Sequence, residues 1–162
     1  MSVYFSSDFH LGHKVITDKY RTMFPDRDSH DNHILDKVAE LTKKDMLLVL
    51  GDMIFDSDDY ERYIGELSKM PCRIKLLMGN HDSLKLYRQD VIEIQAPLFS
   101  YKNMWLSHCP IHPQEIRNRL GNVHGHLHFA ELDDARYFDV GLDKNNYEFV
   151  HLDTIKDYFR KI

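Results

Sequence analysis

Two short apolar runs in the first half of the chain constrain the fold most strongly. The runs are MLLVL at 46–50 and RIKLLM at 73–78, and each ends in a glycine followed by a polar residue. Runs of this kind are typical of strands buried on both faces, as in a parallel sheet. The segment between them, 58–70, has apolar residues at helical spacing behind an Asp-rich start, and Pro71 follows it. Together they predict a β-α-β unit.

The segments before this unit extend the same pattern. Residues 3–5 favour a strand, and residues 28–45 carry an apolar stripe at Ile34, Leu35, Val38 and Leu41 that matches one face of a helix. The first half is therefore expected to be α/β. Open sheets of this kind place their binding and catalytic sites at the carboxyl ends of the strands, so polar residues at those ends are the first candidates for site residues.

The second half of the chain predicts a second sheet. Short strand candidates separated by turn residues lie at 91–94, 98–101, 103–108, 122–126, 137–143 and 147–152, and helix candidates lie at 113–120 and 154–162. The predicted fold class is α/β, with two mixed sheets packed as a sandwich and flanked by helices. A chain of 162 residues has the size of a single domain with one hydrophobic core.

Charge and residue usage argue against several classes of protein. The net charge is −5 and no block of like charges occurs, which disfavours binding of long nucleic acid through its phosphates. No leader pattern or membrane-length apolar run occurs, so we expect a soluble, cytoplasmic protein that does not bind a membrane. Cys72 and Cys109 form no CxxC pair, so we expect two buried thiols rather than a disulfide or a thiolate zinc site.

Eight side chains with metal-binding or acid–base chemistry follow the predicted strands: Asp8, His10, Asp52, Asn80, His81, His108, His126 and His128. The first two, and also the last two, are spaced so that extended backbone would point both side chains to one face. Carboxylate, imidazole and amide ligands suit Mn²⁺, Fe or Zn²⁺ better than Ca²⁺. Seven such ligands exceed what one ion takes from a protein, which indicates two ions bridged by a carboxylate, as in two-metal hydrolysis.

These motifs, in this order, resemble the five motifs of the calcineurin-like metallophosphoesterase superfamily. The surrounding segments SSDFHLGH, LVLGD, LLMGNHD, SHCPI and VHGHLH are similar to a compact bacterial and phage branch of predicted phosphoesterases. The resemblance implies a four-layer α/β/β/α sandwich. It also implies one metallophosphoesterase domain over residues 1–162, because the chain leaves no room for the capping domains of larger relatives.

The resemblance also implies a role for each residue. The first metal would be held by Asp8, His10 and His128, and the second by Asn80, His108 and His126. Asp52 would bridge the two ions, for which Mn²⁺ is the first choice and Fe, Zn²⁺ and Ni²⁺ are the alternatives. A metal-activated hydroxide would attack phosphorus, and His81 would protonate the leaving group.

Six further residues are candidates for supporting roles. Many relatives have an aspartate three residues after the bridging one, where this chain has Phe55, so Asp56 or Asp82 would have to orient His81. His13 is a candidate for substrate contact, and His124 for support of the metal ligands or for a core role. Arg21 and Arg117 are candidates for binding the anionic substrate, with solvated surface charge as the alternative.

The expected function is hydrolysis of a phosphoester, with a preference for a diester of a small, nucleotide-like substrate because the short chain leaves an open cleft. A phosphomonoesterase is the alternative within this class. A catalytically silent binding or scaffold protein is the alternative from another class, and the intact His81 and ligand set favour catalysis over it. A nuclease acting on long DNA or RNA would need a basic stripe, which the scattered Lys and Arg residues disfavour.

Overall fold

The first of two sheets carries the β-α-β unit of the amino-terminal half. The computed structural model describes residues 1–55 and 59–162. The first sheet has the strand order β4 (Glu93–Gln95), β3 (Arg73–Leu77), β2 (Met46–Val49), β1 (Val3–Ser6) and β9 (Val150–His151). Strands β1 to β4 are parallel to their neighbours, and β9 pairs antiparallel with β1. This confirms the prediction of a mixed sheet built on a parallel centre.

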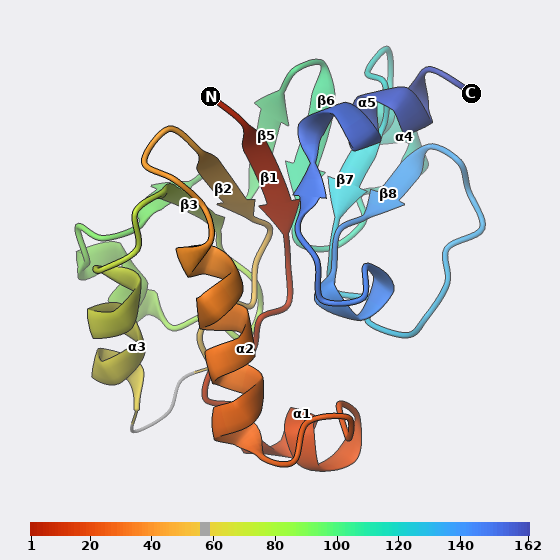
Figure 1. Cartoon of the computed structure of the whole chain (residues 1–162). Coiled ribbons are helices and arrows are strands. Elements are labelled where there is room, and N and C mark those ends of the chain that lie inside the picture. The colour runs from red at the N-terminus through yellow and green to blue at the C-terminus, as the bar shows by residue number, and fades with distance from the viewer. Residues whose placement is uncertain (56–58) are drawn as a thin grey trace.

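The second sheet comes from the carboxy-terminal half and lies beside the first (Figure 1). Its strand order is β5 (Leu98–Tyr101), β6 (Met104–Ser107), β7 (Asn122–His124) and β8 (Tyr137–Asp139). The β5–β6 pair is antiparallel, whereas β6, β7 and β8 are parallel. The chain is therefore an α/β protein with two mixed sheets, as predicted.

Helices cover the sheets and connect them. They are α1 (Lys14–Lys19), α2 (Arg27–Ala39), α3 (Tyr60–Leu67), α4 (Pro113–Ile116) and α5 (Leu152–Phe159), with short 3₁₀ helices η1 (Leu84–Arg88) and η2 (Leu142–Lys144). Helix α2 begins at Asp26, whose carboxylate accepts the backbone N–H of Ser29 at 2.7 Å. In the described part of the chain, each helix is too short or too polar to cross a membrane.

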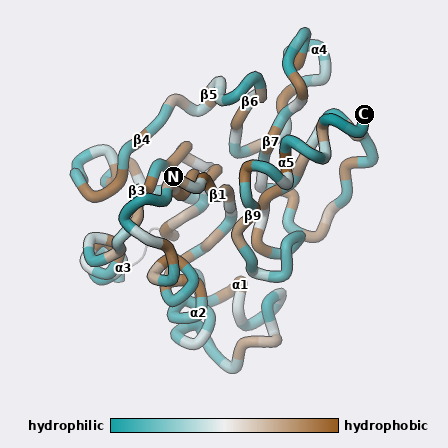
Figure 2. The backbone as a smooth tube through the Cα atoms, turned by 45° about the horizontal axis from the view of Figure 1, so that its top comes forward, coloured by the Kyte–Doolittle hydropathy of each residue, from teal (hydrophilic) through white to brown (hydrophobic). Residues whose placement is uncertain are grey.

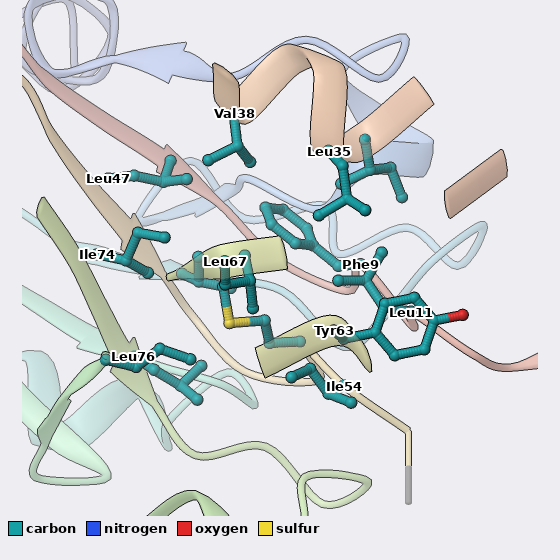
Figure 3. Close-up of a cluster of buried hydrophobic side chains, with 14 of the residues drawn as sticks. Phe9, Leu11, Leu35, Val38, Leu47, Ile54, Tyr63, Leu67, Ile74 and Leu76 are labelled. Atoms are coloured by element: carbon teal, nitrogen blue, oxygen red, sulfur yellow. The ribbon is translucent and has the colours of Figure 1, made fainter. Parts of the chain in front are cut away.

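One cluster of buried side chains joins the outer face of the first sheet to helices α2 and α3 (Figure 3). The strands contribute Leu47, Ile74 and Leu76, which alternate with residues that face the other way. Val38 of α2 and Leu67 of α3 cover them. This cluster fixes the positions of β1, β2 and β3, and therefore of the loops that leave their carboxyl ends.

A second cluster fills the space between the two sheets. Phe5 and Leu48 of the first sheet meet Leu106 and Val123 of the second, and Ile155 of α5 closes the cluster. Figure 2 shows the apolar residues gathered around the central strands, with hydrophilic residues along the outer segments. The sandwich buries this cluster fully, so the loops at the ends of both sheets are held in one fixed arrangement.

Several predicted elements differ from the structure at their ends. The helix expected at 113–120 ends at Ile116, because Arg117 adopts a left-handed φ of 54°. The strand expected at 137–143 ends at Asp139 and is followed by η2. The strand expected at 147–152 shrinks to Val150–His151, because the His151 side chain caps α5 by accepting the N–H of Asp153 at 3.2 Å. Helix α1 was not predicted.

Two glycines give opposite expectations for the same substitution. Gly51 has a φ of +98°, and a Cβ there would collide with the His108 ring and the Gly79 backbone, so Gly51→Ala should destabilise the protein by at least about 2 kcal/mol. Gly65 lies in α3 with nothing within 4 Å of an added Cβ, so Gly65→Ala should stabilise it by roughly 0.5–1 kcal/mol. Urea unfolding measures both changes. A Gly51→Ala variant as stable as the wild type would contradict the steric reason given for Gly51, and a destabilised Gly65→Ala variant would contradict the open space at Gly65.

Candidate metal centre

The eight residues singled out by the sequence lie in loops that leave the carboxyl ends of β1, β2, β3, β6 and β7. Strands β1 and β2 are parallel and point toward the same end of the molecule (Figure 1). Phe9 and Leu11 alternate with Asp8 and His10, and both apolar side chains are completely buried in the cluster under α2 and α3. The core therefore anchors the loop that presents Asp8 and His10.

Five of the eight residues have left-handed backbone conformations: the φ angles are 62° at Asp8, 53° at His10, 54° at Asp52, 73° at His126 and 51° at His128. The expectation that extended backbone aligns Asp8 with His10 is therefore wrong, although the two side chains do meet. Backbone hydrogen bonds hold these conformations: His10 donates its N–H to the Asp52 carbonyl at 2.9 Å. Non-glycine residues rarely adopt such angles, and they concentrate at functional sites.

Asp8, His10 and His128 form the first of two groups of donor atoms. His10 Nε2 lies 3.3 Å from His128 Nε2 and 4.0 Å from Asp8 Oδ1, and His128 Nε2 lies 3.8 Å from that oxygen. Asp8 Oδ1 is buried and has no hydrogen-bond partner in the described part of the chain. A cation bonded at about 2.0–2.2 Å to such donors would set them about 3 to 3.6 Å apart. The two histidine nitrogens already lie in this range, and the Asp8 oxygen would have to move closer by a few tenths of an ångström on binding. The donor types and their grouping therefore fit a metal ion, which would satisfy the unpaired carboxylate oxygen.

Asn80, His108 and His126 form the second group. His108 Nε2 lies 2.9 Å from Asn80 Oδ1 and 3.2 Å from His126 Nδ1. Cys109 was expected to be buried but is exposed, and its Sγ lies within 4.8 Å of ligand atoms of both histidines. This thiol offers the second group a sulfur ligand of the kind that softer metals such as Zn²⁺ prefer.

Asp52 lies between the two groups. Its Oδ2 atom is 3.7 Å from His10 Nε2 in the first group and 3.4 Å from His108 Nε2 in the second. Its other oxygen, Oδ1, accepts the backbone N–H of His81 at 2.9 Å. A single buried carboxylate is thus within reach of both groups, which is the position that a bridging ligand would occupy.

The charges at Asp52 and His108 are strongly coupled. Burial alone would raise the pKa of Asp52, but hydrogen bonding and the charge of His108 outweigh it and lower the pKa to about 2. Burial would lower the pKa of His108, yet Asp52 and Asp8 raise it to about 9. His108 Nδ1 donates to the Leu50 carbonyl at 2.8 Å, so only Nε2 faces the carboxylates. Without a metal, a proton on this nitrogen balances the negative charge that a cation would otherwise neutralise.

Asp143 and Arg21 support the first group from behind. His128 Nδ1 donates to Asp143 Oδ2 at 2.8 Å, which leaves its Nε2 lone pair for the site. Arg21 donates to both oxygens of Asp143 at 2.9 and 2.8 Å and also to the Asp8 carbonyl at 2.7 Å. Burial opposes ionisation of Asp143, but the bonds from His128 and Arg21 hold its pKa well below its usual range. The carboxylate therefore fixes the orientation of a candidate ligand.

This arrangement favours the supporting role among those expected for Arg21 and adds a residue that the sequence analysis missed. Arg21 is completely buried, and its guanidinium bonds to the Asp8 carbonyl and the Asp143 carboxylate. Asp143 ends the segment expected as a strand at 137–143. An acidic residue at the end of a predicted strand is the signal that identified Asp8 and Asp52, and it could have identified Asp143.

We expect Asp143→Asn to weaken metal binding by about 10- to 100-fold, because loss of the acceptor charge frees the His128 ring and lowers its basicity. The measurement is metal affinity by competition with a chelator. Asp157→Asn is the matched control, since Asp157 is exposed and pairs with Arg160 at 2.8 Å on the surface of α5. Equal affinities in the two variants would show that Asp143 does not position His128.

His81 is exposed at the edge of this site. Its ring centroid lies 5.4 Å from that of His10, and no side chain in the described ranges hydrogen-bonds to its ring. Asp82 does not orient it, because the Asp82 carboxylate accepts the N–H groups of Asp52, Met53 and Gly79 at 2.8, 2.7 and 2.8 Å. The other candidate for this role, Asp56, lies outside the described residues.

The remaining candidates occupy three different surroundings. The His13 ring stacks on Phe55 with centroids 4.0 Å apart, and its Nδ1 lies 3.4 Å from His10 Nδ1. His124 is buried, bonds through Nδ1 to the Gly125 carbonyl at 2.9 Å and lines a separate cavity of about 500 Å³. Arg117 is exposed and pairs with Glu115 at 3.1 Å. Of the three, the structure brings only His13 to the site.

Comparisons with known proteins bear on the family and the fold. The family model for calcineurin-like phosphoesterase matches residues 1–160. The Gene 66 protein of Mycobacterium phage D29 is 26% identical over 99% of this chain and 97% of its own length. A protein of unknown function from Aquifex aeolicus has a similar structure, with a TM-score of 0.72 and 22% identity over 96% of this chain and 98% of that one. Nuclease MPE of Pseudomonas putida has a TM-score of 0.54 and 18% identity over 78% and 61% of the two chains.

Proposed function

The chain belongs to the calcineurin-like phosphoesterase family, and we propose that it is a phosphoesterase that uses two divalent metal ions. The position of Asp52 carries this proposal, since one of its carboxylate oxygens lies 3.7 Å from a nitrogen of the first donor group and 3.4 Å from a nitrogen of the second. The buried Oδ1 of Asp8 is the second support, because it has no hydrogen-bond partner in the described part of the chain and a cation would satisfy it.

We assign the ligands as the family resemblance does. Asp8, His10 and His128 would hold one ion, Asn80, His108 and His126 the other, and Asp52 both. Mn²⁺ is the proposed metal because the seven assigned ligands are carboxylate, imidazole and amide groups, and the Cys109 thiol is not one of them. When bound, the ions would activate water for attack on phosphorus and neutralise charge in the transition state.

The protein's own groups supply the remaining chemistry. His81 is exposed at the open side of the site, and its backbone N–H is held by Asp52 at 2.9 Å, so the ring can reach the leaving group of a bound ester. Imidazole is suited to donate that proton because its ordinary pKa lies near neutral pH. Asn80 contributes a neutral oxygen donor, which adds no negative charge where an anionic phosphate must bind.

We propose a phosphodiester of a small, nucleotide-like molecule as the substrate. A monoester dianion would favour an additional cationic side chain at the site. Arg21 is buried and paired with Asp143, and neither Lys nor Arg lines the cavity next to His10 and His81 in the described part of the chain. The smaller charge of a diester fits these surroundings better. Phosphomonoester hydrolysis is the outcome that would revise this choice.

Metal reconstitution tests the proposed function. The protein is purified without metal, and hydrolysis of bis-p-nitrophenyl phosphate and p-nitrophenyl phosphate is compared before and after addition of Mn²⁺. We expect activity only with metal, and faster hydrolysis of the diester. Preference for the monoester would assign a phosphatase. Two bound metals without hydrolysis of either ester would favour a binding protein on the same fold.

A further inference from the structure

A cavity of about 180 Å³ opens directly beside the first donor group. Its lining includes four histidines, His10, His13, His81 and His128, so any group in the cavity lies next to the first donor group. Ile16, Tyr20 and Phe129 complete the lining. Its volume is below the roughly 300–1,000 Å³ of sites that enclose drug-sized ligands, which limits the occupant to about one ring system.

Two exposed aromatic side chains, Tyr20 and Phe129, contribute ring surface to the lining of this cavity. Tyr20 is 60% exposed and Phe129 is 55% exposed, although each is large and apolar over most of its surface. Their ring centroids lie 6.4 Å apart with planes inclined by 26°. Neighbouring aromatic rings left open to water lose the hydrophobic stabilisation that burial would give. Their nearly parallel faces present a surface that a flat ring can cover.

The structure holds both aromatic residues in fixed relation to the donor atoms. Phe129 directly follows His128. The N–H of Tyr20 bonds to the Ile16 carbonyl at 3.0 Å, and the next residue, Arg21, is anchored on Asp143, which also binds His128. Tyr20, Phe129 and the first donor group therefore share one supporting network. A ring bound by the two aromatic residues would lie at a defined distance from the donor atoms.

The lining of the cavity selects against a charged occupant. Among the described residues that form it, none is Lys, Arg, Asp or Glu. Ile16, Tyr20 and Phe129 offer apolar surface and the faces of two rings. A neutral, planar, aromatic group matches this lining. Aromatic side chains stack on any of the nucleobases, because every base has a flat π-face.

We propose that Tyr20 and Phe129 form a stacking subsite for a nucleobase that is joined to the phosphate held at the metal centre. This inference rests on the proposed function and assigns its substrate class as nucleotides rather than simple alkyl or sugar phosphoesters. It also assigns specificity to two residues outside the metal-binding motifs.

Calorimetric titration of the Mn²⁺-loaded protein with adenosine 5′-monophosphate and ribose 5-phosphate tests this subsite, because the two ligands differ only in the base. We expect the nucleotide to bind about 5- to 150-fold more tightly, the range that base stacking on an aromatic side chain supplies. Tyr20→Ala and Phe129→Ala should each remove most of this preference, whereas Tyr20→Phe should retain it. Tyr87→Ala is the matched control, since Tyr87 is 57% exposed and lies outside the cavity.

The outcomes separate this inference from the proposed function. Equal binding of the two ligands, with metal-dependent hydrolysis of bis-p-nitrophenyl phosphate intact, would overturn the subsite and leave the phosphoesterase in place. A base preference that survives Tyr20→Ala and Phe129→Ala would also overturn it. A preference that these variants remove, in a protein without hydrolytic activity, would support the subsite and contradict the enzyme.

Discussion

Asp52→Asn should lower kcat/KM for diester hydrolysis by about 10³-fold and reduce the number of metals bound per chain, because an amide replaces the carboxylate that lies between the two donor groups. Stabilisation of transition-state charge by a bound metal contributes several kcal/mol, which corresponds to this factor. The substitution is nearly isosteric, and Asn can still accept the N–H of His81 through its carbonyl oxygen, so the loops should keep their shape. Metal content by mass spectrometry and steady-state kinetics measure the two effects.

Asp157→Asn again serves as the matched control, since it makes the same change in an exposed ion pair on α5. A circular dichroism spectrum equal to that of the wild type would show that Asp52→Asn is folded. If the folded Asp52 variant kept two metals and full activity, Asp52 would not be the bridge, and the two donor groups would have to act independently.

His81→Ala is expected to separate catalysis from metal binding. His81 does not belong to either donor group, so the variant should keep its metals. Loss of a general acid costs about 10²- to 10⁴-fold when the leaving group is a poor one, such as an alkoxide. With p-nitrophenolate, which leaves without being protonated, the loss should be much smaller. Steady-state kinetics on an alkyl and a p-nitrophenyl ester give the ratio.

The dependence on the leaving group is what distinguishes this role from others. An equal loss on both esters would indicate that His81 binds the phosphate rather than protonating the leaving group. No loss on the alkyl ester, with metals still bound, would remove His81 from the mechanism. His33→Ala provides a control for the loss of an imidazole, because His33 lies on α2 and contacts Phe24 and Tyr147 rather than the donor groups.

The parallel centre of the first sheet could be predicted because the burial of its central strands requires mostly apolar residues there. MLLVL is apolar on both faces because α2 and α3 cover one face of the sheet and the second sheet covers the other. RIKLLM follows this pattern except at Arg73 and Lys75, which pair with Glu93. That the motifs meet at one edge of the fold could likewise be predicted, since parallel strands bring their carboxyl ends together whatever the details of the loops.

The backbone of the site could not be predicted in the same way. The left-handed angles of Asp8, His10 and Asp52 run against local preference, and they persist because hydrogen bonds between the loops after β1 and β2 hold them. Such angles depend on contacts between segments far apart in the chain. The predicted bounds of β9 and α4 were wrong for a related reason, because tertiary contacts and caps rather than periodicity set the ends of these short elements.

Arg21 illustrates what residue type alone leaves open. The sequence allowed it to bind substrate or to support the metal ligands, and its partners include Asp143, 122 positions later in the sequence, the carbonyls of Asp8 and Phe9, and the His30 ring. Only the meeting of these segments reveals that the guanidinium is buried and that Asp143 supports His128. Pairings of this range carry no local signal in a single sequence.

The most direct test of the two-metal account is the crystal structure of the Mn²⁺-loaded protein, with the metals located by anomalous scattering. We predict two peaks about 3.5–4 Å apart on either side of Asp52, the first coordinated by Asp8, His10 and His128 and the second by Asn80, His108 and His126. A single peak, or peaks that do not contact Asp52, would contradict the dinuclear centre.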